Sequence, residues 1–165
     1  MSKADVDNFF REYVTGFMFA DVQREIVRAR DGQDAGNFLC ALALLCYTEI
    51  LGGIQRNTLA SRNGRQNFEC FFRELGPCYG QLLDSGIDVY GLFRCGMAHE
   101  YLIKGRATVS MLKGVEPCGI AVAPNGHYYF TVERYFEDFQ AAALRVQAQL
   151  MIQPSPSLPA ELSGP

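Results

Sequence analysis

The spacing of apolar residues divides the N-terminal part of the chain into helices. Over residues 4–30 the apolar positions recur at steps of three and four, which predicts a long amphipathic helix. Asp34 can cap a second helix that runs to about Leu51, where Gly52-Gly53 is expected to end it. Because this second segment is apolar on nearly every side, we expect it at the centre of the fold.

Two further helices are predicted before the pattern changes, at about 65–75 and from about Tyr79 through Phe93, with Gly76-Pro77 between them. The later one continues into a polar-rich stretch, residues 88–104. A last helix can start at Thr131. Its apolar stripe consists of Tyr135, Phe139, Ala142, Val146 and Leu150.

After Gly105 the residues favour strands. Segments 107–112, 118–123 and 127–132 are short and rich in β-forming residues, and Pro124-Asn125-Gly126 is a strong turn signal between the last two. We therefore expect a small antiparallel β-hairpin or three-strand insert, at about 106–132, before the last helix.

Together these elements predict a mainly α protein, a bundle of about four to five helices that carries this insert. We expect one domain over residues 1–152. The Pro/Ser-rich segment 153–165 has little to bury and is expected to be disordered.

Composition narrows the class of protein. With 48% hydrophobic and 20% charged residues, the chain is typical of soluble globular proteins. The longest apolar run, residues 38–47, is shorter than the roughly 20 residues that span a bilayer, so no membrane partner is expected. The first residues lack the apolar segment of a signal peptide, which favours a cytoplasmic location. A net charge of −3 argues against broad, nonspecific nucleic-acid binding.

Six cysteines, at positions 40, 46, 70, 78, 95 and 118, show no Cys-x-x-Cys pair. We interpret them as reduced and mostly buried thiols. A structural zinc site is not expected, because the close paired spacing of such sites is missing, and the sequence indicates no cofactor.

Candidate chemistry is concentrated in residues 88–104. Arg94 suits a phosphate group, and a histidine such as His99 can move a proton near neutral pH. On a straight α-helix two residues five apart lie about 140° from one another, so both reach one cleft only if the helix bends or ends there; Gly96 loosens it. One histidine cannot be base and acid at once, so a complete site needs a second copy of the chain.

The segment 93–101, Phe-Arg-Cys-Gly-Met-Ala-His-Glu-Tyr, resembles the Arg-x4–6-His motif of the HEPN superfamily. Members of that superfamily are helical bundles, often homodimers in which two such motifs share a cleft. Many are metal-independent endoribonucleases, and others are inactive nucleotide-binding or interaction modules. The resemblance implies that Arg94 holds the scissile phosphate and that His99 acts as base or acid at the ribose 2′-OH. Active members often follow the Arg with Asn, Asp or His, where this chain has Cys95.

Further residues are candidates to support such a site. Glu49 can pair with an arginine, either Arg94 or Arg56, because a carboxylate on a central helix needs a partner. The candidates for contact with RNA or a nucleotide are Arg56, Tyr101 and Lys104, and Glu100 is a candidate supporting residue. Arg56 also belongs to a basic run with Arg62, Arg65 and Arg73 that forms either a solvated face or a phosphate-facing rim.

Several alternatives remain open. The chain can be a non-catalytic interaction or scaffold domain of the same fold that binds a partner protein, with Arg94 buried against a carboxylate and His99 closed off from solvent. Glu100 and Lys104 are spaced for an ordinary surface ion pair. Cys95 and His99, four apart, are spaced for a nucleophile pair or half of a metal site. Binding of a small molecule or a nucleotide in the helical cleft is a further alternative.

Overall fold

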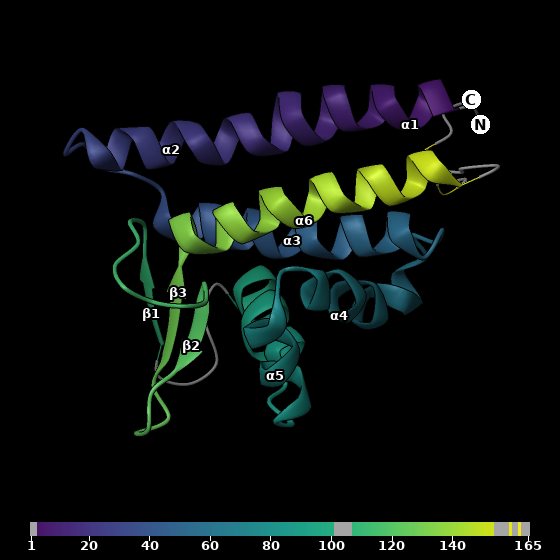
Figure 1. Ribbon diagram of the computed structural model, residues 1–165. Coiled ribbons are helices and arrows are strands. Elements are labelled where there is room, and N and C mark those ends of the chain that lie inside the picture. Colours follow the sequence, from purple (N-terminus) through teal and green to yellow (C-terminus); the bar gives the residue numbers. More distant parts are fainter. Residues whose placement is uncertain (1–2, 101–106, 154–158, 160–161, 163–165) are drawn as a thin grey trace.

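The computed structural model describes residues 3–100, 107–153, 159 and 162. It has the expected fold class, a mainly helical protein with a three-stranded sheet before the last helix (Figure 1). Most of the 153–165 tail, which we predicted to be disordered, lies outside the described residues.

The N-terminal 28 residues of the described chain form one long helical rod in three parts, α1 (Lys3–Phe9), η1 (Phe10–Phe19) and α2 (Ala20–Arg30). The middle part is a π-helix, whose hydrogen bonds join residues five apart. Phe9, Val14 and Phe19 are spaced by five and are all buried. The wider turn therefore keeps residues of this spacing on the face that packs against the core, and the predicted long helix is confirmed.

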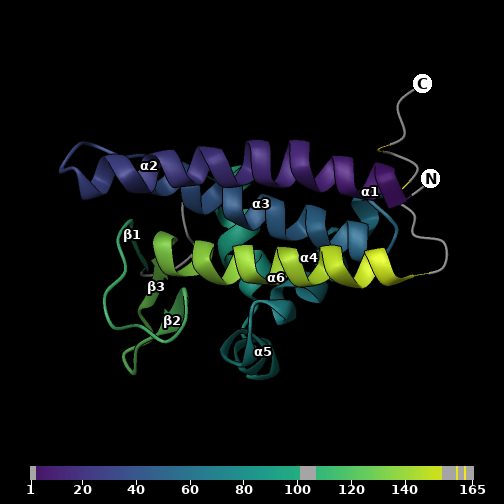
Figure 2. The same cartoon turned by 45° about the horizontal axis from the view of Figure 1, so that its top comes forward.

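Helix α3 (Asn37–Gln55) lies at the centre, packed against α4, α6, η3 and α2 (Figure 2). Its N-cap is Gly36, not Asp34 as we predicted, and the Gly36 N–H donates to Glu25 Oε2 at 3.0 Å. Among the described residues it is the one helix long and apolar enough to cross a membrane, with a mean hydropathy of 1.6. Half of that apolar window is buried within the protein.

The expected end of α3 at Gly52-Gly53 was wrong, because both glycines lie inside the helix. A Cβ built on Gly52 would lie 1.7 Å from the Asn67 carbonyl oxygen of α4 (Gly64–Glu74). The missing side chains therefore let α4 approach the α3 backbone, and this contact with the neighbouring helix outweighs the low helix propensity of glycine.

The fourth predicted helix is two separate helices. The short 3₁₀ turn η2 (Ser61–Asn63) precedes α4, and after α4 come α5 (Pro77–Asp84) and a second π-helix, η3 (Tyr90–Glu100). Gly86, with φ +81°, lies in the break between α5 and η3. Asp88 then caps η3, since its Oδ1 accepts the Gly91 N–H at 2.9 Å.

Three strands, β1 (Ala107–Ser110), β2 (Ile120–Val122) and β3 (Tyr128–Thr131), form a sheet of order β1-β3-β2. The β2–β3 hairpin is antiparallel, as the Pro-Asn-Gly turn predicted. The expectation that the whole sheet is antiparallel was wrong for β1, because β1 pairs parallel to β3. A parallel neighbour needs a crossover, and the segment between β1 and β2 supplies it.

The last helix, α6 (Val132–Ile152), follows β3 directly and runs beside α3 (Figures 1 and 2). Its five predicted stripe residues are all buried. Around them lies an aromatic core, in which Phe139 contacts Phe19, Tyr47 and Phe71. The prediction of α6 succeeded because its apolar residues recur at regular helical spacing and all pack against the same core.

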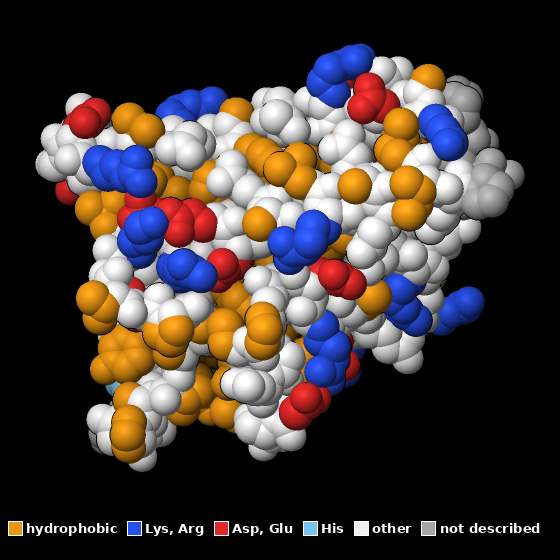
Figure 3. All heavy atoms as spheres, viewed as in Figure 1, with side chains coloured by type: hydrophobic (Ala, Val, Ile, Leu, Met, Phe, Trp, Pro, Cys, Tyr) orange, Lys and Arg blue, Asp and Glu red, His pale blue; other side chains and the backbone are white. Residues whose placement is uncertain are grey.

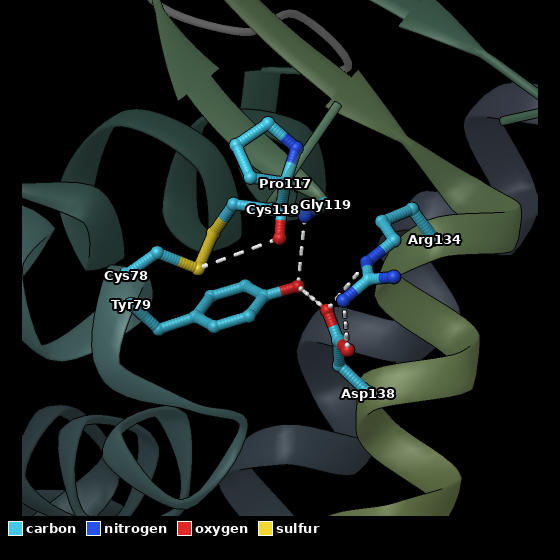
Figure 4. Close-up of a disulfide and its surroundings, with 7 residues drawn as sticks. All are labelled: Cys78, Tyr79, Pro117, Cys118, Gly119, Arg134 and Asp138. Atoms are coloured by element: carbon cyan, nitrogen blue, oxygen red, sulfur yellow. Dashed lines mark hydrogen bonds and ion pairs between the residues drawn. A yellow bond between two sulfur atoms is a disulfide. The ribbon is translucent and has the colours of Figure 1, made fainter. Parts of the chain in front are cut away.

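The cysteine prediction needs a correction, because Cys78 and Cys118 form a disulfide between α5 and the start of β2 (Figure 4). The neighbouring Tyr79 hydroxyl accepts the Gly119 N–H at 2.9 Å and donates to Asp138 Oδ2 of α6 at 2.7 Å. Covalent and polar links therefore tie α5, the sheet and α6 together. The other four cysteines are free.

Candidate functional site

The central feature of the candidate site is an ion pair between η3 and α3. Arg94 Nε lies 2.6 Å from Glu49 Oε2, and each side chain is only 20% exposed. Nε is buried and its N–H is not aligned for a hydrogen bond, so the contact is electrostatic. Of the two arginines considered as partners for Glu49, Arg94 is the one that holds it.

Two residues on neighbouring elements enclose this pair. The Tyr90 hydroxyl, one turn before Arg94, donates to Glu49 Oε2 at 3.4 Å. Gly64 begins α4 beside the carboxylate, where a Cβ would lie 2.8 Å from both Glu49 Oε1 and the Tyr90 hydroxyl oxygen. Glycine at position 64 therefore lets the positive N-terminal end of α4 approach Glu49.

The electrostatics of the pair follow from its partial burial. Burial works against the charged form of Arg94, but Glu49, together with Cys46 and Tyr90, outweighs it and raises the pKa of Arg94 above its ordinary value. Burial and the charge of Glu49 raise the pKa of Tyr90 to about 12. At neutral pH the site therefore holds a cationic Arg94 and an uncharged phenol that donates to Glu49.

The π-helical form of η3 changes how Arg94 and His99 are related. Along a π-helix a backbone hydrogen bond joins residues five apart, so they lie closer to one side of the helix than in an α-helix. The separation of about 140° expected for an α-helix therefore does not apply. His99 is exposed near the end of η3, whereas Arg94 is half-buried one turn earlier.

The hypothesis of a non-catalytic scaffold domain made one prediction for Arg94 and one for His99, and the structure agrees with the first only. Arg94 lies against a carboxylate, as that hypothesis expects. His99 is exposed, whereas that hypothesis expects it to be closed off from solvent.

Other candidates lie farther from the pair. Arg56 is the C-cap of α3, two turns beyond Glu49, and its guanidinium donates to Asn67 Oδ1 at 2.6 Å and Gln66 Oε1 at 3.0 Å. The structure thus does not bring Arg56 to Glu49. Tyr101, Lys104 and the Glu100 side chain lie outside the described residues.

The basic run is largely paired within the chain. Arg65 contacts Asp88 at 2.5 Å, and Arg73 contacts Asp84 at 2.8 Å. The face of the molecule in Figure 3 likewise interleaves acidic and basic side chains. These observations favour the solvated-face interpretation for Arg65 and Arg73, and they leave Arg56 and Arg62 as the run's candidates for a phosphate.

Sequence reasoning missed Tyr90 and Gly64. Tyr90 lies four residues before Arg94, and that helical spacing was the available signal. Gly64 carried no signal, because its role depends on where α4 begins against α3. Within the described part of the chain, no three His, Cys, Asp or Glu side chains gather as a metal site would require.

Comparison with protein-family models, with characterised proteins and with solved structures found no significant match to this chain.

Proposed function

We propose that this protein is a HEPN-like domain that binds RNA and acts as a homodimeric, metal-independent endoribonuclease. The observation that supports this most is the π-helical form of η3, because a backbone hydrogen bond there joins residues as far apart in sequence as Arg94 and His99. Arg94 is at the same time held in place by Glu49. The cytoplasm, where RNA is available, is the proposed location.

In this proposal Arg94 and His99 have different roles in the cleavage of RNA. The ribose 2′-OH attacks the adjacent phosphorus, the bond to the 5′-oxygen breaks, and a 2′,3′-cyclic phosphate and a 5′-OH are formed. His99 takes the proton from the 2′-OH, and His99 of the second copy gives a proton to the leaving oxygen. Arg94 stabilises the negative charge that grows on the phosphate.

Glu49 acts as a positioning residue in this scheme. Its carboxylate engages the Nε edge of Arg94, and a guanidinium carries further N–H donors on its two terminal nitrogens. These terminal donors match the spacing of two phosphate oxygens. Glu49 thus fixes the direction in which the phosphate-binding edge of Arg94 points.

The test is cleavage of single-stranded RNA in the presence of EDTA. His99→Ala should abolish cleavage with little change in melting temperature, because His99 is exposed. His127→Ala is the matched control, since His127 is the other histidine of the chain and lies at the sheet, bonded to Thr108. The proposal fails if the folded parent protein does not cleave RNA, or if His99→Ala cleaves as fast as the parent.

The second candidate function is a non-catalytic interaction domain of the same fold. The half-buried Arg94–Glu49 pair favours it, because such a pair can serve only to join η3 to α3. Cys95, in the place where active HEPN members often carry a polar residue, favours it too. Under this alternative Arg94→Lys and Glu49→Gln change stability and partner binding, and the parent protein shows no nuclease activity.

A further inference from the structure

The disulfide encloses the candidate site within one covalent loop. Cys78 lies in the first turn of α5, and Cys118 comes two residues before β2 begins (Figure 4). The 40-residue separation between the two cysteines contains all of η3, with Arg94 and His99. The bond therefore ties together the two ends of the segment that carries the candidate site, so its formation or loss changes the conformational freedom of that segment.

A thiol from solution can reach one sulfur of this bond. Cys78 is partly exposed beside the exposed Pro117, whereas Cys118 is only 5% exposed. A small thiolate such as glutathione attacks the Cys78 sulfur, and the bonding electrons leave on the Cys118 sulfur, which takes up a proton. A second glutathione attacks the mixed disulfide and releases Cys78 as a thiol. The protein thus gains two thiols, while two glutathione molecules become one disulfide.

Noncovalent contacts beside the bond hold the same segments together. The Tyr79 hydroxyl accepts the Gly119 N–H at 2.9 Å and donates to Asp138 of α6 at 2.7 Å (Figure 4). A Cβ built on Gly119 would lie 2.5 Å from the Tyr135 backbone, so the chain packs directly on α6 just before β2. Reduction removes the covalent link and leaves these contacts, which keep α5, the sheet and α6 assembled.

The helix η3 is coupled to both sides of the bond. On one side it follows α5 after a short connection through Gly86, whose φ is +81°. On the other side the Phe93 ring packs against the rings of Tyr128 and Phe130 at centroid distances of 5.6 and 6.2 Å. These rings belong to β3, which pairs with β2. A loosening between α5 and β2 therefore acts on the residue that directly precedes Arg94.

The freedom of η3 decides how open Arg94 is to a ligand. The Arg94 side chain is only 20% exposed beside Glu49, so a large anion gains full access to the guanidinium only when η3 moves away from α3. A cross-link between the ends of a segment reduces the number of open conformations that the segment can adopt. The oxidised loop thus favours the enclosed arrangement, and the reduced chain opens more often.

We propose that Cys78–Cys118 is a redox switch for η3, operated by exchange with glutathione or a similar small thiol. In the oxidised protein η3 is held closed over the Arg94–Glu49 pair, and in the reduced protein η3 opens locally while the fold persists. The inference concerns the movement of η3 and holds for any ligand of Arg94. Only its consequence for RNA cleavage, a faster reaction of the reduced protein, rests on the proposed function.

The first test is the redox equilibrium of the folded protein in glutathione buffers without denaturant. Alkylation and mass spectrometry count the oxidised and reduced forms. The bond should be mainly reduced when reduced glutathione is in large excess, and it should form again as oxidised glutathione replaces it. The circular dichroism of the parent should be kept throughout. A bond that glutathione cannot reduce in the folded protein, or a chain that unfolds on reduction, would overturn the inference.

The second test compares backbone hydrogen exchange in the two forms. At labelling times for which the centre of α6 stays protected in both forms, the amides of η3 should exchange about tenfold or more faster in the reduced protein. Cys78→Ala/Cys118→Ala should exchange like the reduced parent and ignore glutathione. Cys70→Ser is the matched control, because Cys70 is a free cysteine of α4 and its loss leaves the disulfide intact. It should respond like the parent.

Equal exchange of η3 in the oxidised and reduced parent would contradict the switch, as would a double variant that behaves like the oxidised parent. The outcome is separable from that of the nuclease test. Faster exchange of η3 on reduction, with no cleavage of RNA in either form, keeps this inference and removes the proposed function. Cleavage at one rate in both forms, with exchange of η3 unchanged, keeps the proposed function and removes this inference.

Discussion

Glu133 is the most deeply placed carboxylate among the described residues that form ion pairs, with 5% of the residue exposed at the start of α6. Burial alone would raise its pKa, but the Lys113 backbone N–H at 2.8 Å and the Arg30 guanidinium outweigh burial and lower it. The ionised Glu133 side chain of α6 therefore binds two distant parts of the chain, the end of α2 and the loop after β1.

The lowered pKa of Glu133 predicts how stability depends on pH. A group with a depressed folded-state pKa contributes stability that is fully present above its unfolded pKa of about 4.5 and is lost as pH falls through the folded value. Glu133→Gln should lower the free energy of unfolding at pH 7 by about 1–3 kcal/mol and flatten its pH dependence below about pH 4.5. Urea unfolding between pH 3 and 7 measures both, with the exposed Glu12→Gln as control. Equal slopes for parent and Glu133→Gln would contradict this account.

At the residue scale, the sequence predicted the ion pair of the candidate site, but it did not predict the exposure or the neighbours of the other residues there. Glu49 was expected to need an arginine, because a half-buried carboxylate is unstable alone, and the pair with Arg94 follows that reasoning. The exposure of His99 and the closeness of Gly64 were not predictable. Both depend on how η3 and α4 are placed against α3, and neighbours in the sequence do not determine that.

At the element scale, the contact between α3 and α4 is set by glycine. Gly52→Ala should lower the free energy of unfolding by about 2 kcal/mol or more, because its Cβ would overlap the Asn67 carbonyl oxygen and force the helices apart. Gly80→Ala in α5 is the control, since its Cβ meets nothing closer than Arg73 Nη1 at 3.7 Å. It should be neutral or stabilising by up to about 1 kcal/mol. Thermal and urea unfolding compare them, and equal losses would refute the close-contact explanation.

The disulfide is the second feature that joins elements. It closes a loop of 40 residues, for which loss of unfolded-chain entropy gives about 4 kcal/mol at most. Dithiothreitol should therefore lower the free energy of unfolding of the parent by about 2–4 kcal/mol and leave Cys78→Ala/Cys118→Ala unchanged. Thiol counting should find four reactive cysteines in the unfolded, unreduced parent. Six reactive thiols would contradict the bond. In the reducing cytoplasm that we propose as the location, the reduced form would be the working one.

Elements whose apolar residues follow a regular pattern were predictable from the sequence. Features that depend on contacts with distant parts of the chain were not. The α6 stripe and the Asn-Gly hairpin are local signals, and both were confirmed. The continuation of α3 through its glycines depends on α4, and the parallel pairing of β1 depends on a crossover. The Cys78–Cys118 pair likewise becomes visible only when α5 and the sheet meet.

At the scale of the whole molecule, α3 connects the fold to the proposed activity. Its inner face packs against α4 and α6, and Glu49 on it holds Arg94. The composition of α3 predicted a central helix, and its contacts with α4 and α6 confirm that position.

The central claim is that His99 and Arg94 cleave RNA through the ribose 2′-OH. The most direct measurement compares two oligonucleotides of one sequence, one of ordinary RNA and one 2′-O-methylated throughout, incubated with the parent protein in EDTA. We predict cleavage of the first, with 2′,3′-cyclic phosphate ends, and none of the second, because the methyl group blocks the attacking oxygen. Cleavage of both strands, or of neither by a folded dimer, would contradict the claim.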